Sequence, residues 1–217
     1  MANLPARGLY AITDRHHCAL PSILSNVEQA VRGGAVIVQY RDKGTDTPRR
    51  KLEASQILEI CRDSNVPLII NDDVSLAKSI SADGVHVGKD DGTLANARAQ
   101  LGPKAIVGVS CYNSVELALS AQRGGADYIA FGRFFPSSVK PNAVLASLEQ
   151  LRQNRPRFTV PVVAIGGITP ENANIVLDAG ADLLAVINAV FGTDDPRYAA
   201  SRFSKLFPQQ TSGVVDD

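Results

Sequence analysis

Short apolar segments rich in β-branched residues alternate with longer amphipathic segments along the chain, and this alternation constrains the fold more than any other feature. The apolar segments are LYAIT (9–13), VIVQY (36–40), PLIIN (67–71), GVHVG (84–88), AIVGVS (105–110), YIAFG (128–132), VPVVAIGG (160–167) and LLAVI (183–187). They are apolar at nearly every position, which is typical of parallel strands covered on both faces. Several of the segments between them carry apolar residues at the three- or four-residue spacing of amphipathic helices.

One connecting loop recurs in three places. RGGAVIVQY, RGGADYIAF and DAGADLLAV each end a helix at glycine, turn through Ala or Ala-Asp, and enter a strand. Glycine adopts the left-handed conformation that closes many helices. The repeated loop and the eight strand segments favour a single (β/α)₈ barrel of the TIM type over a doubly wound sheet. No linker divides the chain, so we expect one barrel domain over residues 1–207 and a loose tail over residues 208–217.

The composition argues against several classes of partner. The chain has 22 basic and 22 acidic residues, so no overall field attracts nucleic acid or an anionic membrane. No apolar run approaches the length of a membrane span, and the first residues lack the apolar region of a secretory signal. The three cysteines have no CxxC spacing, which indicates free thiols in a reducing compartment. We expect a cytoplasmic protein that binds small molecules, either as a monomer or as a homo-oligomer.

Polar residues stand at the ends of the predicted strands, where a barrel gathers them at one rim and builds its active site. They include Asp14, Gln39, Asn71, Asp72, Asp91, Ser110, Arg133 and Asn188. Asp72 and Asp91 follow neighbouring strands, and two carboxylates with water and phosphate oxygens are a usual way to hold Mg²⁺. The alternative is that both acids cap helices or are solvated, as we expect of Asp73 and Asp90.

Three cations are expected at the same rim. Arg41 and Lys43 in QYRDK offer a forked donor and a point charge, a pairing suited to phosphate groups. Lys140 in SSVKP would add a third cation, although a lone surface lysine is usually only solvated. Gly166 and Gly167 in AIGGIT let a backbone approach a phosphate, and the following helix start favours an anion, although tight turns also use paired glycines.

Other reactive side chains have no defined role at this stage. His86 lies between apolar residues in GVHVG, and both a buried structural histidine and a substrate contact fit that position. Cys111 follows Ser110 without an evident activating base, so we interpret it as a packing residue. No Ser/His/Asp order is recognisable, and the rim chemistry therefore has no evident protein nucleophile.

Seven motifs together resemble the thiamine-phosphate synthase family over roughly residues 8–191. They are GLYAITD, QYRDK, IINDD, GVHVGKDD, GVSCYN, ADYIAFGRFFPSSVKP and VPVVAIGGIT. The resemblance implies a (β/α)₈ barrel that condenses a hydroxymethylpyrimidine diphosphate with a hydroxyethylthiazole phosphate. The products would be thiamine phosphate and pyrophosphate, with Mg²⁺ as cofactor. Related thiazole tautomerases share the barrel and an AIGGIT-like segment but differ from this sequence where the metal acids stand.

The resemblance also assigns roles to individual residues. It places Arg41, Lys43, Ser110 and Lys140 in catalysis, and Asp72 and Asp91 on Mg²⁺. It assigns the pyrimidine diphosphate to Gln39, Tyr40, Arg41, Asp42, Lys43, Asn71, Ser110 and Lys140. It assigns the thiazole phosphate to Ser137, Ser138, Val139, Gly167, Ile187 and Asn188.

The sequence departs from the family pattern at three positions. Val139 stands where the family has the second threonine of a Thr-x-Thr loop, which removes a hydroxyl donor to phosphate. Lys89 replaces a common glutamine and Asn188 a common serine. Two alternative functions remain at this stage. A thiazole tautomerase-like isomerase would need no metal acids, and a silent barrel that binds a phosphorylated metabolite is supported by Val139 alone.

Overall fold

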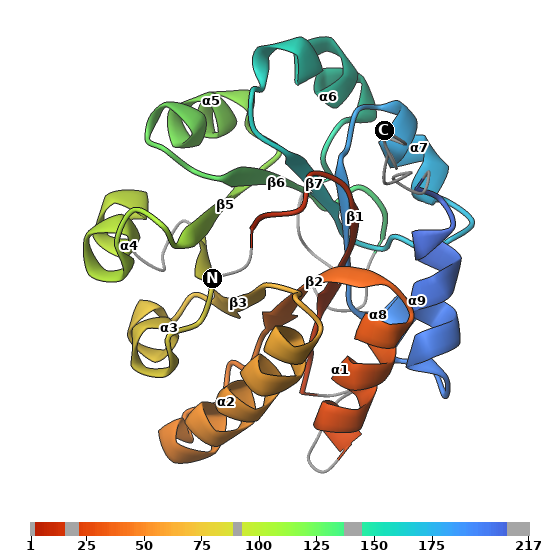
Figure 1. Ribbon diagram of the computed structural model, residues 1–217. Coiled ribbons are helices and arrows are strands. Elements are labelled where there is room, and N and C mark those ends of the chain that lie inside the picture. Colours follow the sequence, from red (N-terminus) through yellow and green to blue (C-terminus); the bar gives the residue numbers. More distant parts are fainter. Residues whose placement is uncertain (1–2, 16–21, 89–92, 137–144, 208–217) are drawn as a thin grey trace, which may run out of the picture.

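A closed barrel of eight parallel strands forms the centre of the molecule (Figure 1). The computed structural model describes residues 3–15, 22–88, 93–136 and 145–207. Each strand pairs with the next along the chain, and the last strand pairs with the first. This arrangement confirms the (β/α)₈ barrel predicted from the alternating segments. The tail over residues 208–217 lies outside the described residues, so its expected looseness stays a prediction.

Strands and helices alternate around the barrel. The strands are β1 (Gly8–Ile12), β2 (Ala35–Tyr40), β3 (Leu68–Asn71), β4 (Gly84–Val87), β5 (Ile106–Tyr112), β6 (Tyr128–Gly132), β7 (Val162–Ile165) and β8 (Leu183–Val186). The α-helices are α1 (Ser22–Arg32), α2 (Thr47–Asp63), α3 (Val74–Ile80), α4 (Leu94–Leu101), α5 (Val115–Arg123), α6 (Leu148–Asn154), α7 (Ala173–Asp178), α8 (Asn188–Phe191) and α9 (Pro196–Ser204). A short 3₁₀ helix (Arg155–Arg157) follows α6.

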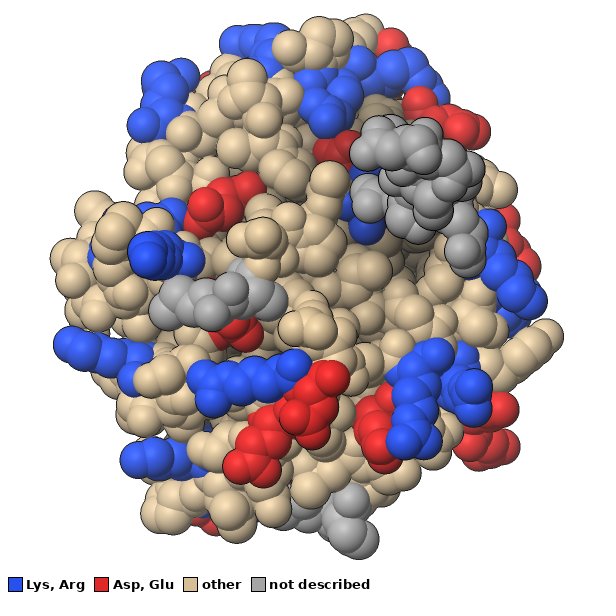
Figure 2. Space-filling view, in the orientation of Figure 1, with Lys and Arg blue, Asp and Glu red and all other residues tan. Residues whose placement is uncertain are grey.

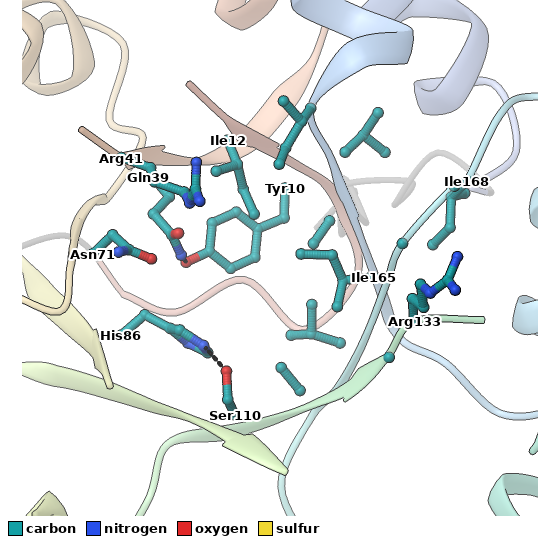
Figure 3. A pocket seen from close by; sticks show the side chains of 18 of the residues that line it. Tyr10, Ile12, Gln39, Arg41, Asn71, His86, Ser110, Arg133, Ile165 and Ile168 are labelled. Atoms are coloured by element: carbon teal, nitrogen blue, oxygen red, sulfur yellow. Dashed lines mark hydrogen bonds between the residues drawn. The ribbon is translucent and has the colours of Figure 1, made fainter. Parts of the chain in front are cut away.

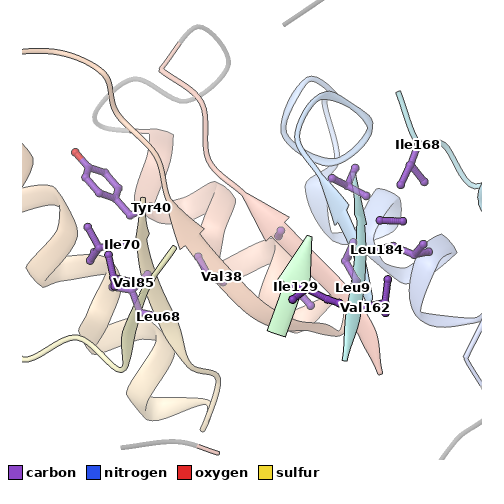
Figure 4. Packing of buried hydrophobic residues seen from close by; sticks show 14 of the residues in the cluster. Leu9, Val38, Tyr40, Leu68, Ile70, Val85, Ile129, Val162, Ile168 and Leu184 are labelled. Carbon is purple, nitrogen blue, oxygen red and sulfur yellow. The ribbon is translucent and has the colours of Figure 1, made fainter. Parts of the chain in front are cut away.

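Successive side chains of a strand point to opposite faces of the barrel wall. The buried apolar residues therefore form two clusters, one outside the strands and one inside the barrel. Outward-facing residues such as Leu9, Val38 and Leu184 pack between the strands and the helices (Figure 4). Inward-facing residues fill the barrel itself, and Tyr10 and Tyr128 are the largest of them. The interior is therefore a packed core below the rim at the carboxyl ends of the strands, where the polar side chains begin.

The recurring loop closes helices as the sequence predicted. Its glycines at positions 34, 125 and 180 have φ angles of 97°, 86° and 103°, in the left-handed region that favours glycine. The predicted seventh strand was too long, because Gly166 and Gly167 also take positive φ and leave the extended conformation. That strand ends at Ile165 instead.

The described cysteines are packing residues. Cys61 and Cys111 are buried and free, and burial raises the pKa of each thiol to about 12. This confirms the free thiols expected at these two positions and the packing role expected of Cys111, whereas Cys18 lies outside the described residues. Within the described ranges, no helix has the length and apolar character needed to cross a membrane.

Candidate active site

A cavity of about 410 Å³ opens at the carboxyl ends of the strands. This volume is in the range of sites for small ligands. Most described residues of the predicted site line it: Gln39, Arg41, Lys43, Asn71, Asp72, Ser110, Gly167, Ile187 and Asn188. They come from β2, β3, β5 and the segments after β2, β3, β7 and β8, so the barrel brings together segments far apart in the sequence (Figure 3).

The charged side chains on the surface are mixed in sign. On the face shown in Figure 2, acidic and basic side chains are interspersed among the described residues. This distribution agrees with the formal net charge of zero. The electrostatics that matter for a ligand are therefore local to the cavity, where Arg41 is paired with Asp14 and Lys43 with Asp72.

Asp14 fixes Arg41 at the cavity wall. The Arg41 Nη1 atom donates to Asp14 Oδ2 at 2.7 Å, and the Arg41 backbone N–H donates to Thr13 Oγ1 at 3.0 Å. Asp14 is almost fully buried. Charge-assisted hydrogen bonds of this kind hold a guanidinium in one orientation. Asp14 therefore positions Arg41, a role signalled in the sequence only by an acid at the end of the first strand.

Asp72 lies at the cavity wall with two close neighbours. Its Oδ2 atom accepts hydrogen bonds from Lys43 Nζ and from Asn71 Nδ2, the latter at 2.5 Å. Its backbone has a φ of 64°, and its N–H donates to the carbonyl of His86 at 2.8 Å. Asp73, and not Asp72, caps α3 by accepting from the N–H of Leu76 at 2.8 Å. The helix-cap interpretation is thus confirmed for Asp73, and Asp72 is left facing the cavity.

Tyr40 and Asp42 belong to a polar cluster beneath the loop after β2. The Tyr40 hydroxyl donates to Glu53 Oε2 at 2.7 Å, and Arg49 binds both Asp42, at 2.6 Å, and Glu53, at 2.8 Å. Burial and the Glu53 hydrogen bond raise the pKa of Tyr40. Burial alone would raise the pKa of Asp42, but hydrogen bonds from Gly44 and Arg49 outweigh it and lower that pKa.

This cluster shapes the site from outside the cavity. Neither Tyr40 nor Asp42 lines the cavity formed by the described residues. Both were predicted to contact the pyrimidine diphosphate, and their side chains are hydrogen-bonded to Glu53 and Arg49 of α2. The contact with the substrate stays a prediction. The side chains anchor the loop that carries Arg41 and Lys43.

A chain of hydrogen bonds crosses the cavity floor. Gln39 Nε2 donates to the Tyr10 hydroxyl at 2.7 Å, and the Tyr10 and Tyr128 hydroxyls lie 2.8 Å apart. The Tyr128 hydroxyl lies 3.0 Å from His86 Nδ1, and His86 Nε2 lies 2.8 Å from Ser110 Oγ (Figure 3). Burial raises the pKa of both tyrosines, so their hydroxyls stay protonated. His86 is thus buried and hydrogen-bonded, as the structural interpretation predicted, and it also lines the cavity, so a substrate contact stays a prediction.

Close packing holds the rings of this chain. The Tyr128 ring stacks on His86 with centroids 5.6 Å apart and meets Tyr10 edge-on at 5.8 Å. Gly108 makes the space, because a Cβ atom there would lie 1.9 Å from Tyr128 Cζ. The sequence interpretation missed Tyr10 and Tyr128 because both sit in apolar runs. Strand alternation was the available signal, since each is inward-facing in its strand.

The opposite wall is formed by the paired glycines and by the loop after β6. A Cβ atom on Gly166 would lie 2.2 Å from Arg133 Cβ, and one on Gly167 would lie 2.3 Å from the carbonyl oxygen of Pro136. Close approach of the β6 loop therefore requires glycine here. Arg133 also lines the cavity, which adds a guanidinium to this wall that had no assigned role.

Five predicted site residues lie outside the described residues: Asp91, Ser137, Ser138, Val139 and Lys140. Their roles stay predictions. In the described part of the chain, no group of three or more His, Cys, Asp or Glu side chains is arranged to hold a metal ion.

The fold and the cavity define a class of protein, namely a (β/α)₈ barrel enzyme whose rim is equipped for small anionic ligands. Comparison with known proteins specifies the family. The family model for thiamine monophosphate synthase matches residues 9–190. The chain belongs to this family, whose members are transferases that form thiamine phosphate. The resemblance detected in the motifs is thereby confirmed.

Individual relatives cover nearly the whole chain. A thiamine-phosphate synthase of Nitrosococcus oceani is 50% identical over 202 residues, which are 93% of each protein. One of Methylococcus capsulatus is 49% identical and covers 98% of this chain and 96% of its own. The solved structure of thiamine phosphate pyrophosphorylase from Pyrococcus furiosus superposes with a TM-score of 0.84 at 36% identity, covering 93% of this chain and 95% of that one.

Proposed function

We propose that the rim cavity is the active site of a Mg²⁺-dependent thiamine-phosphate synthase reaction. The substrates are 4-amino-2-methyl-5-hydroxymethylpyrimidine diphosphate and 4-methyl-5-(2-hydroxyethyl)thiazole phosphate. One observation carries the proposal: Arg41, Lys43 and Asp72 meet amide and hydroxyl side chains on one side of a single cavity, opposite the Gly166–Gly167 turn. Such a cavity offers separate walls for a diphosphate and for a monophosphate.

The wall formed by β2, β3 and β5 suits the pyrimidine diphosphate. Gln39, Asn71 and Ser110 supply hydrogen-bonding groups of the kind that fix a polar ring. Arg41 and Lys43 supply the charge for the diphosphate oxygens. The Asp14 hydrogen bond orients Arg41 before a ligand arrives, which lowers the ordering cost of binding.

Asp72 fits a role in holding Mg²⁺. Its carboxylate already binds a cation, the Lys43 ammonium, at the cavity wall. Carboxylate oxygen is also the ligand type that Mg²⁺ prefers. Asp91 is the proposed second ligand. When bound, the metal ion would neutralise charge on the diphosphate oxygens.

The opposite wall suits the thiazole phosphate. The glycine turn ends at Gly167, and the segment after β8 brings Ile187 and Asn188 to the same cavity. The backbone of these residues is proposed to hold the phosphate, together with Ser137, Ser138 and Val139. Lys140 is proposed to bind the departing pyrophosphate from the same loop.

The reaction then follows from position and charge. The carbon–oxygen bond between the pyrimidine methylene and the diphosphate breaks, and its electron pair leaves with pyrophosphate. The pyrimidine amine donates electrons to the developing cation, and the thiazole nitrogen forms the new bond to the methylene carbon. Arg41, Lys43 and Lys140 stabilise the charge that grows on the leaving oxygen. Holding both reactants in one cavity supplies much of the remaining rate, so no protein nucleophile is required.

The setting proposed for this reaction is the cytoplasm, with soluble phosphorylated substrates and no nucleic-acid or membrane partner. The buried free thiols of Cys61 and Cys111 support a reducing compartment. A monomer and a homo-oligomer are both compatible with the sequence, and sedimentation of the purified chain would distinguish them.

The experiment mixes the protein with both substrates and Mg²⁺ and follows pyrophosphate and thiamine phosphate together. We expect both products in equal amounts and neither when one substrate is omitted. Chelation of Mg²⁺ should stop the reaction, and excess Mg²⁺ should restore it. Pyrophosphate release at an unchanged rate without the thiazole phosphate would indicate a hydrolase. Isomerisation of a thiazole substrate without metal would indicate the tautomerase alternative.

A further inference from the structure

The hydrogen-bond chain on the cavity floor joins two cavity-lining residues that come from different, non-neighbouring strands. Gln39 at one end belongs to β2 and Ser110 at the other end belongs to β5. Both line the cavity and both are proposed to contact the pyrimidine diphosphate. The links between them are Tyr10, Tyr128 and His86, which have no role in the reaction proposed above. Figure 3 shows Tyr10 beside Gln39, and His86 bonded to Ser110.

The direction of each hydrogen bond follows from the number of hydrogens available. The amide of Gln39 donates to the Tyr10 oxygen at 2.7 Å. A tyrosine hydroxyl has one hydrogen to donate, so with the amide of Gln39 as its donor, Tyr10 gives its hydroxyl hydrogen to the Tyr128 oxygen. Tyr128 in turn has one hydrogen left to give, and its remaining partner in the chain is Nδ1 of His86.

The same reasoning fixes the state of the imidazole. Because Nδ1 of His86 accepts a hydrogen bond, the neutral ring carries its hydrogen on Nε2. Nε2 then donates to Ser110 Oγ at 2.8 Å. The hydroxyl hydrogen of Ser110 is consequently not used within this hydrogen-bond chain. It is available to a ligand in the cavity.

The opposite direction is unfavourable. Suppose that Ser110 donated to His86, His86 to Tyr128 and Tyr128 to Tyr10. The Tyr10 oxygen would then accept hydrogen bonds from both Gln39 and Tyr128. Its own hydrogen would then lack an acceptor among its described partners, in a side chain that is 1% exposed. A buried donor without a partner costs about 1–3 kcal/mol. The Gln39 end therefore sets the direction of the chain.

We propose that Tyr10, Tyr128 and His86 are positioning residues that hold Ser110 as a hydrogen-bond donor to the substrate. In this state Ser110 Oγ accepts from His86 and gives its hydrogen to an anionic or ring-nitrogen acceptor of the bound pyrimidine diphosphate. The ring packing around Gly108 keeps the oxygen and nitrogen atoms at bonding distance. The identity of the ligand rests on the proposed function, whereas the direction of the chain does not.

A spectroscopic test reads the imidazole directly in the free protein. The chain has three histidines, so His16→Gln and His17→Gln variants assign the His86 nitrogen resonances. We expect an unprotonated Nδ1 and a protonated Nε2 in the parent. Tyr128→Phe removes the donor to Nδ1 and should shift both resonances toward a mixture of tautomers. Ser110→Ala should leave Nδ1 unprotonated, because the direction is set from the Gln39 end.

The matched control is Tyr40→Phe. Tyr40 is also 1% exposed, and its hydroxyl is bound to Glu53 behind β2 rather than to this chain. Its loss should leave the His86 tautomer unchanged. A protonated Nδ1 in the parent, or His86 resonances that do not move in folded Tyr128→Phe, would overturn the proposal.

A kinetic test separates positioning from general destabilisation. Tyr128→Phe should lower kcat by roughly three- to tenfold, since one hydrogen bond is worth about that factor. The KM values of both substrates should change by less than about twofold. In a Ser110→Ala background, Tyr128→Phe should cause no further loss of kcat, because its effect acts through Ser110. A merely structural role would lower kcat by the same factor in both backgrounds, and that result would refute the proposal.

The two arms also distinguish this proposal from the proposed function. If the parent formed no thiamine phosphate, the proposed function would fail, and the nitrogen spectra would still decide the direction of the chain. Melting temperatures of the Tyr128→Phe and Tyr40→Phe variants confirm that folded proteins are being compared.

Discussion

At the scale of the residue, the site is set by how each charge is held. Arg41 is bound to buried Asp14, whereas Lys43 is bound to Asp72, and its side chain is 59% exposed. The Arg41–Asp14 pair is largely shielded from solvent, whereas the lysine of the Lys43–Asp72 pair is exposed. A ligand that enters the cavity therefore meets an oriented guanidinium and a solvent-exposed ammonium, two kinds of cation that suit the oxygens of a diphosphate.

The first prediction concerns Asp72. Asn tolerates the left-handed backbone at this position, so Asp72→Asn should fold normally. Turnover should fall by roughly two orders of magnitude, because a proposed Mg²⁺ ligand is lost. Initial rates over a range of Mg²⁺ concentrations measure this effect. Asp73→Asn is the control, since asparagine also caps helices and turnover should be retained. Near-parent turnover of Asp72→Asn at limiting Mg²⁺ would remove the metal assignment.

The second prediction concerns Gly108. In Gly108→Ala, the added methyl group would overlap the Tyr128 ring, so the ring or the strand must shift. Overpacking of this kind costs about 1–3 kcal/mol of unfolding free energy, and the hydrogen-bond chain should break with it. The control is Gly102→Ala, where no atom lies within 4 Å and only the positive φ is strained. Chemical denaturation measures both, and equal losses in the two variants would contradict the packing argument.

At the scale of the element, aspartates join neighbouring strands at the end of the barrel opposite the site. Asp83, Asp127 and Asp182 precede β4, β6 and β8, and each carboxylate accepts from a backbone N–H at or next to the start of the preceding strand. The distances are 3.0, 2.7 and 2.9 Å. The Ala-Asp pair in the recurring loop, which the sequence pattern predicted only as a turn, thus joins neighbouring strands.

The third prediction tests that device at Asp182. Asp182→Ala removes the acceptor of the Val162 N–H and the partner of Arg155, which lies 2.9 Å away. Leaving these groups unpaired should cost about 1–3 kcal/mol. The melting temperature should fall by roughly 2–4 °C for each kcal/mol. Asp178→Ala, at an exposed helical position, should change the melting temperature little. A similar small change in Asp182→Ala would show that the contact contributes nothing.

The fourth prediction concerns the cluster that anchors the loop after β2. The lowered pKa of Asp42 means that its charged form stabilises the fold at pH values above the usual aspartate pKa. This contribution is lost as the pH falls through the folded-state pKa. Asp42→Asn should therefore be less stable than the parent at neutral pH, and the difference should shrink below about pH 4. Denaturation at several pH values measures it, with exposed Asp63→Asn as control. A difference that stays constant with pH would exclude the charge as its cause.

At the scale of the whole molecule, the sequence predicted the barrel well because the fold depends on repeated patterns. The apolar runs marked every strand, and glycines at the recurring loop marked the helix ends. Side-chain placement was harder to predict where it depends on contacts between distant strands. Tyr40 and Asp42 lie in a motif that resembles a substrate loop. Their side chains are directed to α2 because they form hydrogen bonds there with Glu53 and Arg49. Tyr10 and Tyr128 meet across the barrel over 118 residues of sequence, a contact that neither run reveals alone.

The last prediction concerns the effect of ligand binding on the thermal stability of the whole barrel. The cavity is lined by residues from all eight strands or the segments that follow them, so a ligand bound there is linked to global unfolding. Pyrophosphate with Mg²⁺, present at 100 times its dissociation constant, should stabilise the fold by about 2.7 kcal/mol. For a domain of this size that corresponds to a rise in melting temperature of roughly 5–10 °C. The rise should be smaller without Mg²⁺ and should vanish in Arg41→Ala, because the fixed guanidinium is a main contact. Lys51→Ala, in the exposed part of α2, should keep it. An equal rise in all three proteins would place the pyrophosphate elsewhere on the surface and refute the assignment of this wall.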